Sequence, residues 1–209
     1  MLEMHSYQYV AQFNHFRPLL AIRAESAMMA GPMPSPLGHA LAGLTVGWLA
    51  ESKPPSTSSI RDALRPLVLW CTAFAVLPDA DLLVDWHRSG THSLTATALI
   101  FIVAMVVTGK VTRRPAWRLA MALAAAQGTH LLLDWLAMDL NPPSGFQLFW
   151  PFDHEFYVSG LDIFPGTDRR LMMPRALMLN ARSAMWEVLI MGPLAVGAWI
   201  IRRRRSRRA

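Results

Sequence analysis

The stretch AWRLAMALAAAQGTHLLLDWLA, residues 116–137, decides the class of fold. It is about as long as a membrane-spanning helix, which needs roughly 20 mostly apolar residues, yet it carries His130 and Asp134 near its end. Side chains four residues apart leave the same face of a helix, so these two can reach one ion or two adjacent ions. A buried imidazole or carboxylate is unfavourable unless it is paired or bound to metal. The stretch therefore predicts a membrane helix that ends in part of a polar site.

The composition agrees with a membrane protein. Of 209 residues, 53% are hydrophobic and only 16% are charged, and the mean hydropathy is +0.27. The chain is long enough for one helical domain and more apolar than a typical soluble one. Its single cysteine, Cys71, excludes an internal disulfide and a site built on several thiolates. The expected fold is all-α: a polytopic bundle of about five hydrophobic helices, at residues 37–50, 64–77, 94–109, 116–137 and 184–201.

The distribution of basic residues predicts the orientation of this bundle. If the five helices alternate in direction, the 51–63 and 110–115 loops and the C-terminus share one side, which then holds 13 of the 20 lysines and arginines. By the positive-inside rule this side is cytoplasmic. The expected location is the bacterial inner membrane, with the basic tail 202–209 in the cytoplasm, where it would contact anionic lipid and not nucleic acid.

The candidate metal ligands all fall on the opposite, external side. They open the first helix, follow the second and close the fourth: His39, Asp79, Asp81, His92, His130 and Asp134. Three distant parts of the sequence that arrive at one depth on one side are what a shared site requires. We therefore expect a single metal centre, with separately satisfied polar residues as the alternative.

Two short motifs could serve catalysis as well as binding. Asp79 and Asp81 follow Pro78, and either one could be a bridging ligand or a general base, or simply a helix cap. His87 and Arg88 lie in the sequence His-Arg-Ser-Gly-Thr-His-Ser. A cation beside two histidines suggests that an anion binds there, so Arg88 is a candidate for holding a substrate phosphate or carboxylate, against the alternative of a solvated loop arginine.

Together these motifs resemble a known family. Gly38-His39-Ala40 with Gly43, Pro-Asp-Ala-Asp, His-Arg-Ser-Gly-Thr-His-Ser, His-Leu-Leu-Leu-Asp and Leu-Phe-Trp-Pro-Phe, in this order, are similar to the YdjM-like, LexA-regulated family of bacterial inner-membrane metal-dependent hydrolases. That family is distantly similar to the zinc-dependent phospholipase C and P1 nuclease group. The resemblance implies a phosphoesterase-like hydrolase, but a second His-x-x-x-Glu pair is missing, so a full trinuclear centre is not expected.

The sequence therefore predicts a metal-dependent hydrolase that uses activated water on an anionic phosphoester, with a lipid-linked phosphoester as one candidate substrate. Nitrogen and oxygen donors without thiolate suit one or two zinc ions, with manganese or magnesium as alternatives. The expected ligands are those named above, and Asp79, Asp81, His87 and Arg88 are the candidates for catalysis. A non-catalytic protein whose metal site is structural or serves transport is the rival hypothesis.

The remaining segments receive less specific predictions. Residues 1–32 are expected to be an extension outside the hydrolase domain of residues 33–201. The 138–183 segment, rich in aromatics, is expected to be a long loop at the site end, because a structureless loop of that length in a compact domain usually has a function. It could lie in the membrane interface as a lid or as an anchor.

Overall fold

The computed structural model describes residues 34–51, 66–84, 88–113, 116–139, 143–168 and 173–208. Five α-helices lie in these ranges: α2 (Pro36–Ala50), α4 (Pro66–Val76), α5 (Leu94–Thr112), α6 (Trp117–Trp135) and α7 (Pro174–Ser206). Two short 3-10 helices, η2 (Leu77–Val84) and η3 (Gly90–His92), connect α4 to α5. The described residues contain isolated β-bridges but no strands, so the predicted all-α class is confirmed.

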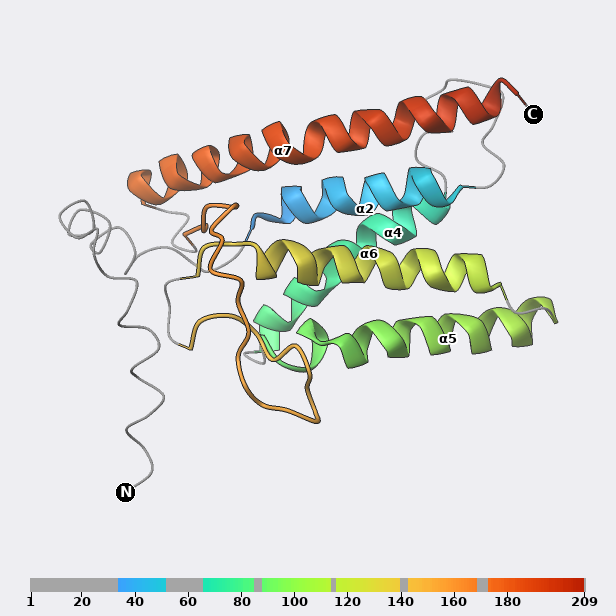
Figure 1. Ribbon diagram of the computed structural model, residues 1–209, viewed down its shortest axis with the longest axis horizontal. Helices are drawn as coiled ribbons and strands as arrows, with labels where there is room; N and C mark the ends of the chain where they lie inside the picture. Colours follow the sequence, from blue (N-terminus) through green and yellow to red (C-terminus); the bar gives the residue numbers. More distant parts are fainter. Residues whose placement is uncertain are drawn as a thin grey trace.

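The helices run side by side along the long axis of the molecule (Figure 1). In that view α7 lies at one edge and α5 at the other, with α2 and α6 between them. Helix α4 crosses at an angle and packs against both α2 and α6, and α5 packs against α6. Helix α6 is the centre of the bundle, and its alanines Ala120, Ala124 and Ala126 are buried against its neighbours.

Two glycines set the close contact between α2 and α4. A Cβ atom at Gly43 would lie 2.6 Å from the Cα of Thr72, and one at Gly47 would lie 2.7 Å from the Cα of Val68. Any side chain at these positions would push the helices apart. This contact matters for the site because α2 carries His39, while α4 leads directly into Asp79.

Four of the five expected helices agree with the structure to within a few residues, but the last one is much longer. It was predicted at 184–201 and extends over Pro174–Ser206. Pro174 is well suited to a first helical turn, and the polar residues that follow it hide this part of the helix from a search for apolar runs. The arginines from Arg202 onward continue the helix, since arginine favours helical structure. The predicted 138–183 loop is correspondingly shorter.

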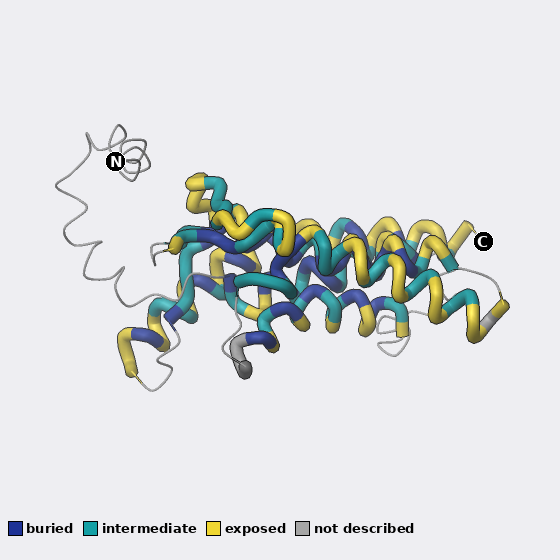
Figure 2. The backbone as a smooth tube through the Cα atoms, turned by 90° about the horizontal axis from the view of Figure 1, so that it is seen from below, coloured by how far each residue is buried: buried dark blue, intermediate teal, exposed yellow. Residues whose placement is uncertain are grey.

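Only two of the described helices are long and apolar enough to cross a membrane. They are α5, over Leu94–Val111, and α7. None of the residues in the α5 stretch is buried within the protein. Figure 2 shows exposed residues, in yellow, along the helix that leads to the C-terminus, α7. With 15 and 11 residues, α2 and α4 are too short to span alone. A bundle of five spanning helices is therefore not confirmed.

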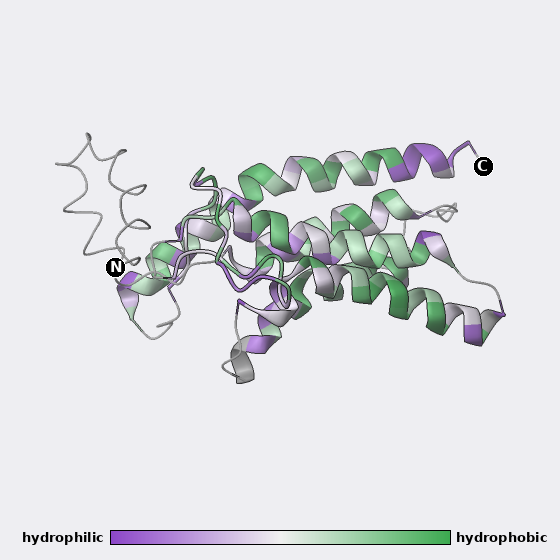
Figure 3. Cartoon of the chain, turned by 60° about the horizontal axis from the view of Figure 1, so that its bottom comes forward, coloured by the Kyte–Doolittle hydropathy of each residue, from purple (hydrophilic) through white to green (hydrophobic). Residues whose placement is uncertain are grey.

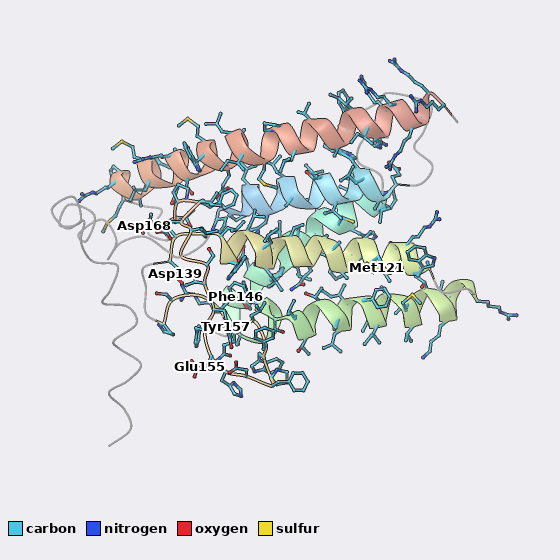
Figure 4. The ribbon with its side chains drawn as sticks, in the orientation of Figure 1. Met121, Asp139, Phe146, Glu155, Tyr157 and Asp168 are labelled. Carbon is cyan, nitrogen blue, oxygen red and sulfur yellow. The ribbon has the colours of Figure 1, made fainter. Side chains whose placement is uncertain are left out.

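The segment that follows α6 folds over one end of the bundle. Ala137 forms a bridge with Phe164, and Phe146 pairs with Tyr157. The backbone N–H of Leu94 donates to the carbonyl oxygen of Leu148 at 2.9 Å, which ties the loop to the start of α5. Figure 4 shows Phe146 and Tyr157 at this end, far from Met121 near the start of α6.

Candidate metal centre

Four separate elements bring His and Asp side chains together at the loop end of the bundle. His39 lies in the first turn of α2, Asp79 in η2 and His92 at the end of η3, and both His130 and Asp134 lie in the last turns of α6. The three imidazoles and Asp134 are almost entirely buried. Asp79 is the most exposed of the group, with 13% of its side-chain surface accessible. The predicted convergence of these five residues is thus present in the structure.

The distances within this cluster are short enough for shared ligands. The Nε2 atom of His130 lies 3.1 Å from Asp134 Oδ2 and 3.7 Å from Asp79 Oδ1. His39 Nε2 lies 3.3 Å from Asp134 Oδ1 and 3.9 Å from Asp79 Oδ2. Two overlapping sets of three residues have donor atoms within 4.8 Å of one another: His39, Asp79 and His130, and His92, His130 and Asp134. The cluster could accordingly hold one ion or two adjacent ions.

Several donor atoms of the cluster make no hydrogen bond in the structure. These buried atoms are Nδ1 and Nε2 of His39, Oδ1 of Asp79 and both carboxylate oxygens of Asp134. The imidazoles and carboxylates are nevertheless within ion-pair distance of each other. Buried polar atoms are nearly always satisfied, so a group of unsatisfied donor and acceptor atoms in one small cluster is typical of a metal-binding site. Nitrogen and oxygen donors of this kind fit a divalent cation such as zinc.

The hydrogen bonds of two histidines direct their Nε2 atoms inward. His130 Nδ1 lies 2.8 Å from the carbonyl oxygen of Ala75, which can only accept, so Nδ1 carries the proton. His92 Nδ1 lies 3.1 Å from Asp81 Oδ2 and is oriented in the same way. The two Nε2 atoms are 3.0 Å apart, and their lone pairs would repel unless a cation lies near both.

Without metal, a proton can take this place. Burial lowers the pKa of His92, but the carboxylates of Asp79 and Asp81 and the charge of Asp134 outweigh it, so the pKa is raised to about 9. A divalent ion would substitute for this proton, since metal binding requires the neutral imidazole. The electrostatics of the cluster therefore favour positive charge at its centre.

The two aspartates of the Pro-Asp-Ala-Asp motif take different positions. Asp79 lies within 4 Å of all three imidazoles. Asp81 instead contacts Nδ1 of His92 and the hydroxyl of Thr91, on the outer side of the ring. A carboxylate in that position fixes the orientation of a ligating histidine. The geometry thus favours Asp79 as the metal ligand and Asp81 as the residue that orients His92. The sequence alone left open which of the two aspartates is the ligand.

Arg88 has an acidic partner within the protein. Its guanidinium lies 3.0 Å from Asp139 Oδ2 and donates to the carbonyl oxygen of Pro143 at 2.8 Å. Asp139 also accepts from the backbone N–H of Gly145 at 2.6 Å. These contacts join Arg88 to the loop that follows α6, and the predicted role in anion binding stays a prediction. His87, the other catalytic candidate of this motif, lies outside the described residues, as do residues 1–33.

Sequence reasoning gave no role to Glu187 of α7, which lies next to the centre. Its buried carboxylate accepts hydrogen bonds from the backbone N–H groups of Ser35 and Gly38, at 2.5 and 2.9 Å, and from the hydroxyl of Ser35. It therefore caps the start of α2 one residue before His39, where a negative charge is stabilised by the helix dipole. An acidic residue within an otherwise apolar stretch of α7 was the available signal.

Taken together, the fold and the site define a helical membrane protein with a buried His/Asp cluster at one end. The family comparison agrees with this class. The model of the YdjM inner membrane protein family matches residues 33–206, and the chain belongs to this family. No curated protein and no solved structure matches the chain. The predicted family and its membrane location are thus confirmed, whereas the similarity to phospholipase C and P1 nuclease receives no support from these comparisons.

Proposed function

We propose that the protein is a metal-dependent hydrolase that cleaves a phosphoester with activated water. The observation that carries the proposal is the buried cluster of His and Asp side chains, whose ligand atoms form two overlapping sets within 4.8 Å and several of which make no hydrogen bond. His39, His92, His130, Asp79 and Asp134 would hold one or two divalent ions, with zinc as the expected metal. Such an ion would supply Lewis acidity, lowering the pKa of a water molecule to near 7 and polarising the phosphoryl group.

The protein's own residues would contribute orientation and proton transfer. Asp81 and the Ala75 carbonyl hold the rings of His92 and His130 by their Nδ1 atoms. Asp79, with 13% of its side chain exposed, is the ligand that an incoming substrate can reach, and it could accept a proton from the attacking water. Glu187 holds the first turn of α2 and with it the backbone of His39.

The rival function is a metal site that only holds the helices together. A structural site is closed, with all coordination positions taken by protein, whereas a catalytic site keeps a position for water. The partial exposure of Asp79 favours the catalytic alternative, because the other four ligands have nearly inaccessible side chains.

The test is hydrolysis by detergent-purified protein of phosphoester substrates, including phospholipid. We expect activity that a chelator abolishes and that added zinc or manganese restores. His130→Ala should abolish both metal binding and activity, while His154→Ala, in the exposed loop, should leave both unchanged. Tight metal binding in wild-type protein with no hydrolysis of any phosphoester would favour the structural site instead.

A further inference from the structure

The distance of the cluster from the basic end of the bundle can be derived from helix geometry. Two contacts mark the basic end: the buried ion pair between Glu51, after α2, and Arg202 of α7, and the 3.1 Å hydrogen bond from the backbone N–H of Ala116 to the hydroxyl of Thr108. The arginine-rich end of α7 lies there too, as the hydrophilic colouring in Figure 3 shows. These contacts provide reference levels on four of the five described helices.

Measured along the helices from these reference contacts, the cluster is less than one bilayer thickness away. Helices rise roughly 1.5 Å per residue, so His39 lies about 18 Å from Glu51 along α2. By the same rise, His130 lies about 21 Å from Ala116 along α6, and the start of α5, beside His92, about 21 Å from Thr108. The hydrocarbon core of a bilayer is about 30 Å thick, and any tilt of the helices would reduce the depth they cover.

Exposed tryptophans give a second indication of depth. Trp135 directly follows the ligand Asp134, and Trp186 directly precedes Glu187. Both are exposed on the outside of the bundle, at the level of the cluster. Tryptophan is enriched at the boundary between hydrocarbon and headgroups. The cluster is therefore at, or slightly below, the depth of the ester and phosphate groups of a lipid.

The surface beside Asp79, the partly exposed ligand of the cluster, is apolar. Asp79 is two residues from Leu77, which is 57% exposed at the junction of α4 and η2. Leu132 of α6 and Leu189 of α7 are also exposed near this level. None of the residues in the α5 stretch Leu94–Val111 is buried within the protein, so α5 is well suited to contact lipid.

We infer that the metal centre works at bilayer depth, in the leaflet opposite the basic end, on a phosphate-bearing lipid that enters laterally beside η2. The inference rests on the proposed hydrolase function and adds where the substrate comes from. The lipid phosphate would reach Asp79 and the ions from the side, while its acyl chains stay in the leaflet next to Leu77. A substrate dissolved in water would have to leave the aqueous phase to reach the same point.

Spin labels can measure this depth in vesicles of phosphatidylcholine and phosphatidylglycerol. In a Cys71→Ala background, one nitroxide is attached at Leu77→Cys, with Val103→Cys in the middle of α5 and Arg208→Cys at the basic end as references. Oxygen, which concentrates in lipid, and chromium oxalate, which stays in water, then compete to relax each label. We expect the ratio of oxygen to chromium oxalate accessibility at Leu77 to lie between the ratios at Val103 and Arg208, and to exceed the ratio at Arg208 several-fold. A label at Leu77 that is as accessible to chromium oxalate as the one at Arg208 would overturn the inference.

A second measurement separates this inference from the proposed function. Wild-type protein in vesicles is compared on phosphatidylcholine and on glycerophosphocholine, which has the same phosphodiester but no acyl chains. Metal-dependent hydrolysis of the lipid alone supports both proposals. Equal hydrolysis of the two compounds leaves the hydrolase intact but contradicts lateral entry. If the protein hydrolyses neither of these compounds and does not hydrolyse phosphatidylglycerol, the proposed activity on lipid phosphodiesters is contradicted. This holds whatever depth the spin labels report.

Discussion

The two ends of the bundle both bury charged groups, but they satisfy them in opposite ways. At the basic end, Glu51 and Arg202 are buried and paired with each other. At the other end, His39, Asp79 and Asp134 have buried atoms without hydrogen bonds. The first arrangement is complete within the protein, while the second leaves ligand atoms that could hold a metal ion. Burial of charge therefore does not by itself identify a functional site, and the unsatisfied atoms do.

The comparison predicts that changes at the two ends have different consequences. A change in the His/Asp cluster should alter metal binding more than folding of the metal-free chain. A change in the Glu51–Arg202 pair should alter stability and leave the affinity for metal intact. The following variants test this division, beginning with the one expected to have the largest effect.

His130→Ala should nearly abolish metal binding. His130 belongs to both overlapping sets of ligands, so its loss affects an ion in either position. Loss of a residue that only supports a ligand typically weakens metal binding about 10- to 100-fold, and loss of this ligand should exceed that. Elemental analysis and competition with a zinc indicator measure the effect. His154→Ala is the control. If His130→Ala kept the metal content of the wild-type protein, the proposed metal site would be wrong.

Arg202→Met should destabilise the protein by about 3 kcal/mol, because it leaves the buried carboxylate of Glu51 without its cation. Arg204→Met, at an exposed position of the same helix, is the matched control and should have little effect. Unfolding in detergent gives the stability, and zinc titration gives the affinity. The division between the two ends fails if Arg202→Met loses metal as strongly as His130→Ala does.

Asp81→Asn should weaken metal binding about 10- to 100-fold without removing it, since Asp81 orients His92 through Nδ1. The amide oxygen of asparagine can still accept that hydrogen bond, but without the negative charge. Asp153→Asn, in the loop, serves as the control. If Asp81→Asn and Asp79→Asn lost metal to the same extent, Asp81 would act as a ligand, contrary to the geometry.

Arg88→Ala distinguishes a substrate contact from a loop contact, and it should lower stability by about 3 kcal/mol, because the nearly buried carboxylate of Asp139 loses its cation. If Arg88 only holds the loop through Asp139, then Arg88→Ala and Asp139→Asn should lower hydrolysis equally. If it also binds substrate phosphate, Arg88→Ala should lower kcat/KM further than Asp139→Asn, with unchanged metal content in both. Parallel kinetics of the two variants decide between these roles.

The sequence predicted the parts of the fold that depend on local pattern. Apolar runs gave the positions of α2, α4, α5 and α6, and the side of the membrane on which each polar motif falls gave the convergence of the ligands. The start of α7 at Pro174 was missed because its first turns mix polar and apolar residues. The number of spanning helices was not predictable in this way, because an apolar run such as that of α6 can be buried by neighbouring helices instead of facing lipid.

The site was predictable down to the residue types but not to their separate roles. Asp79 and Asp81 are two residues apart and equivalent by spacing, and only the fold places one among the imidazoles and the other behind His92. The pairing of Arg88 with Asp139 likewise depends on a loop conformation in which Arg88 has a positive φ of 69°. Contacts between distant segments of this kind leave no periodic signal in a sequence.

The central claim is that the unsatisfied end of the bundle binds metal, and X-ray absorption spectroscopy of the zinc-loaded protein tests it most directly. We predict one or two tightly bound ions per chain, with only nitrogen and oxygen neighbours at about 2.0–2.2 Å and clear scattering from several imidazoles. The imidazole signal should be lost in His130→Ala and retained in His154→Ala. Purified protein that takes up no divalent ion on titration, or a spectrum without imidazole ligands, would contradict the account.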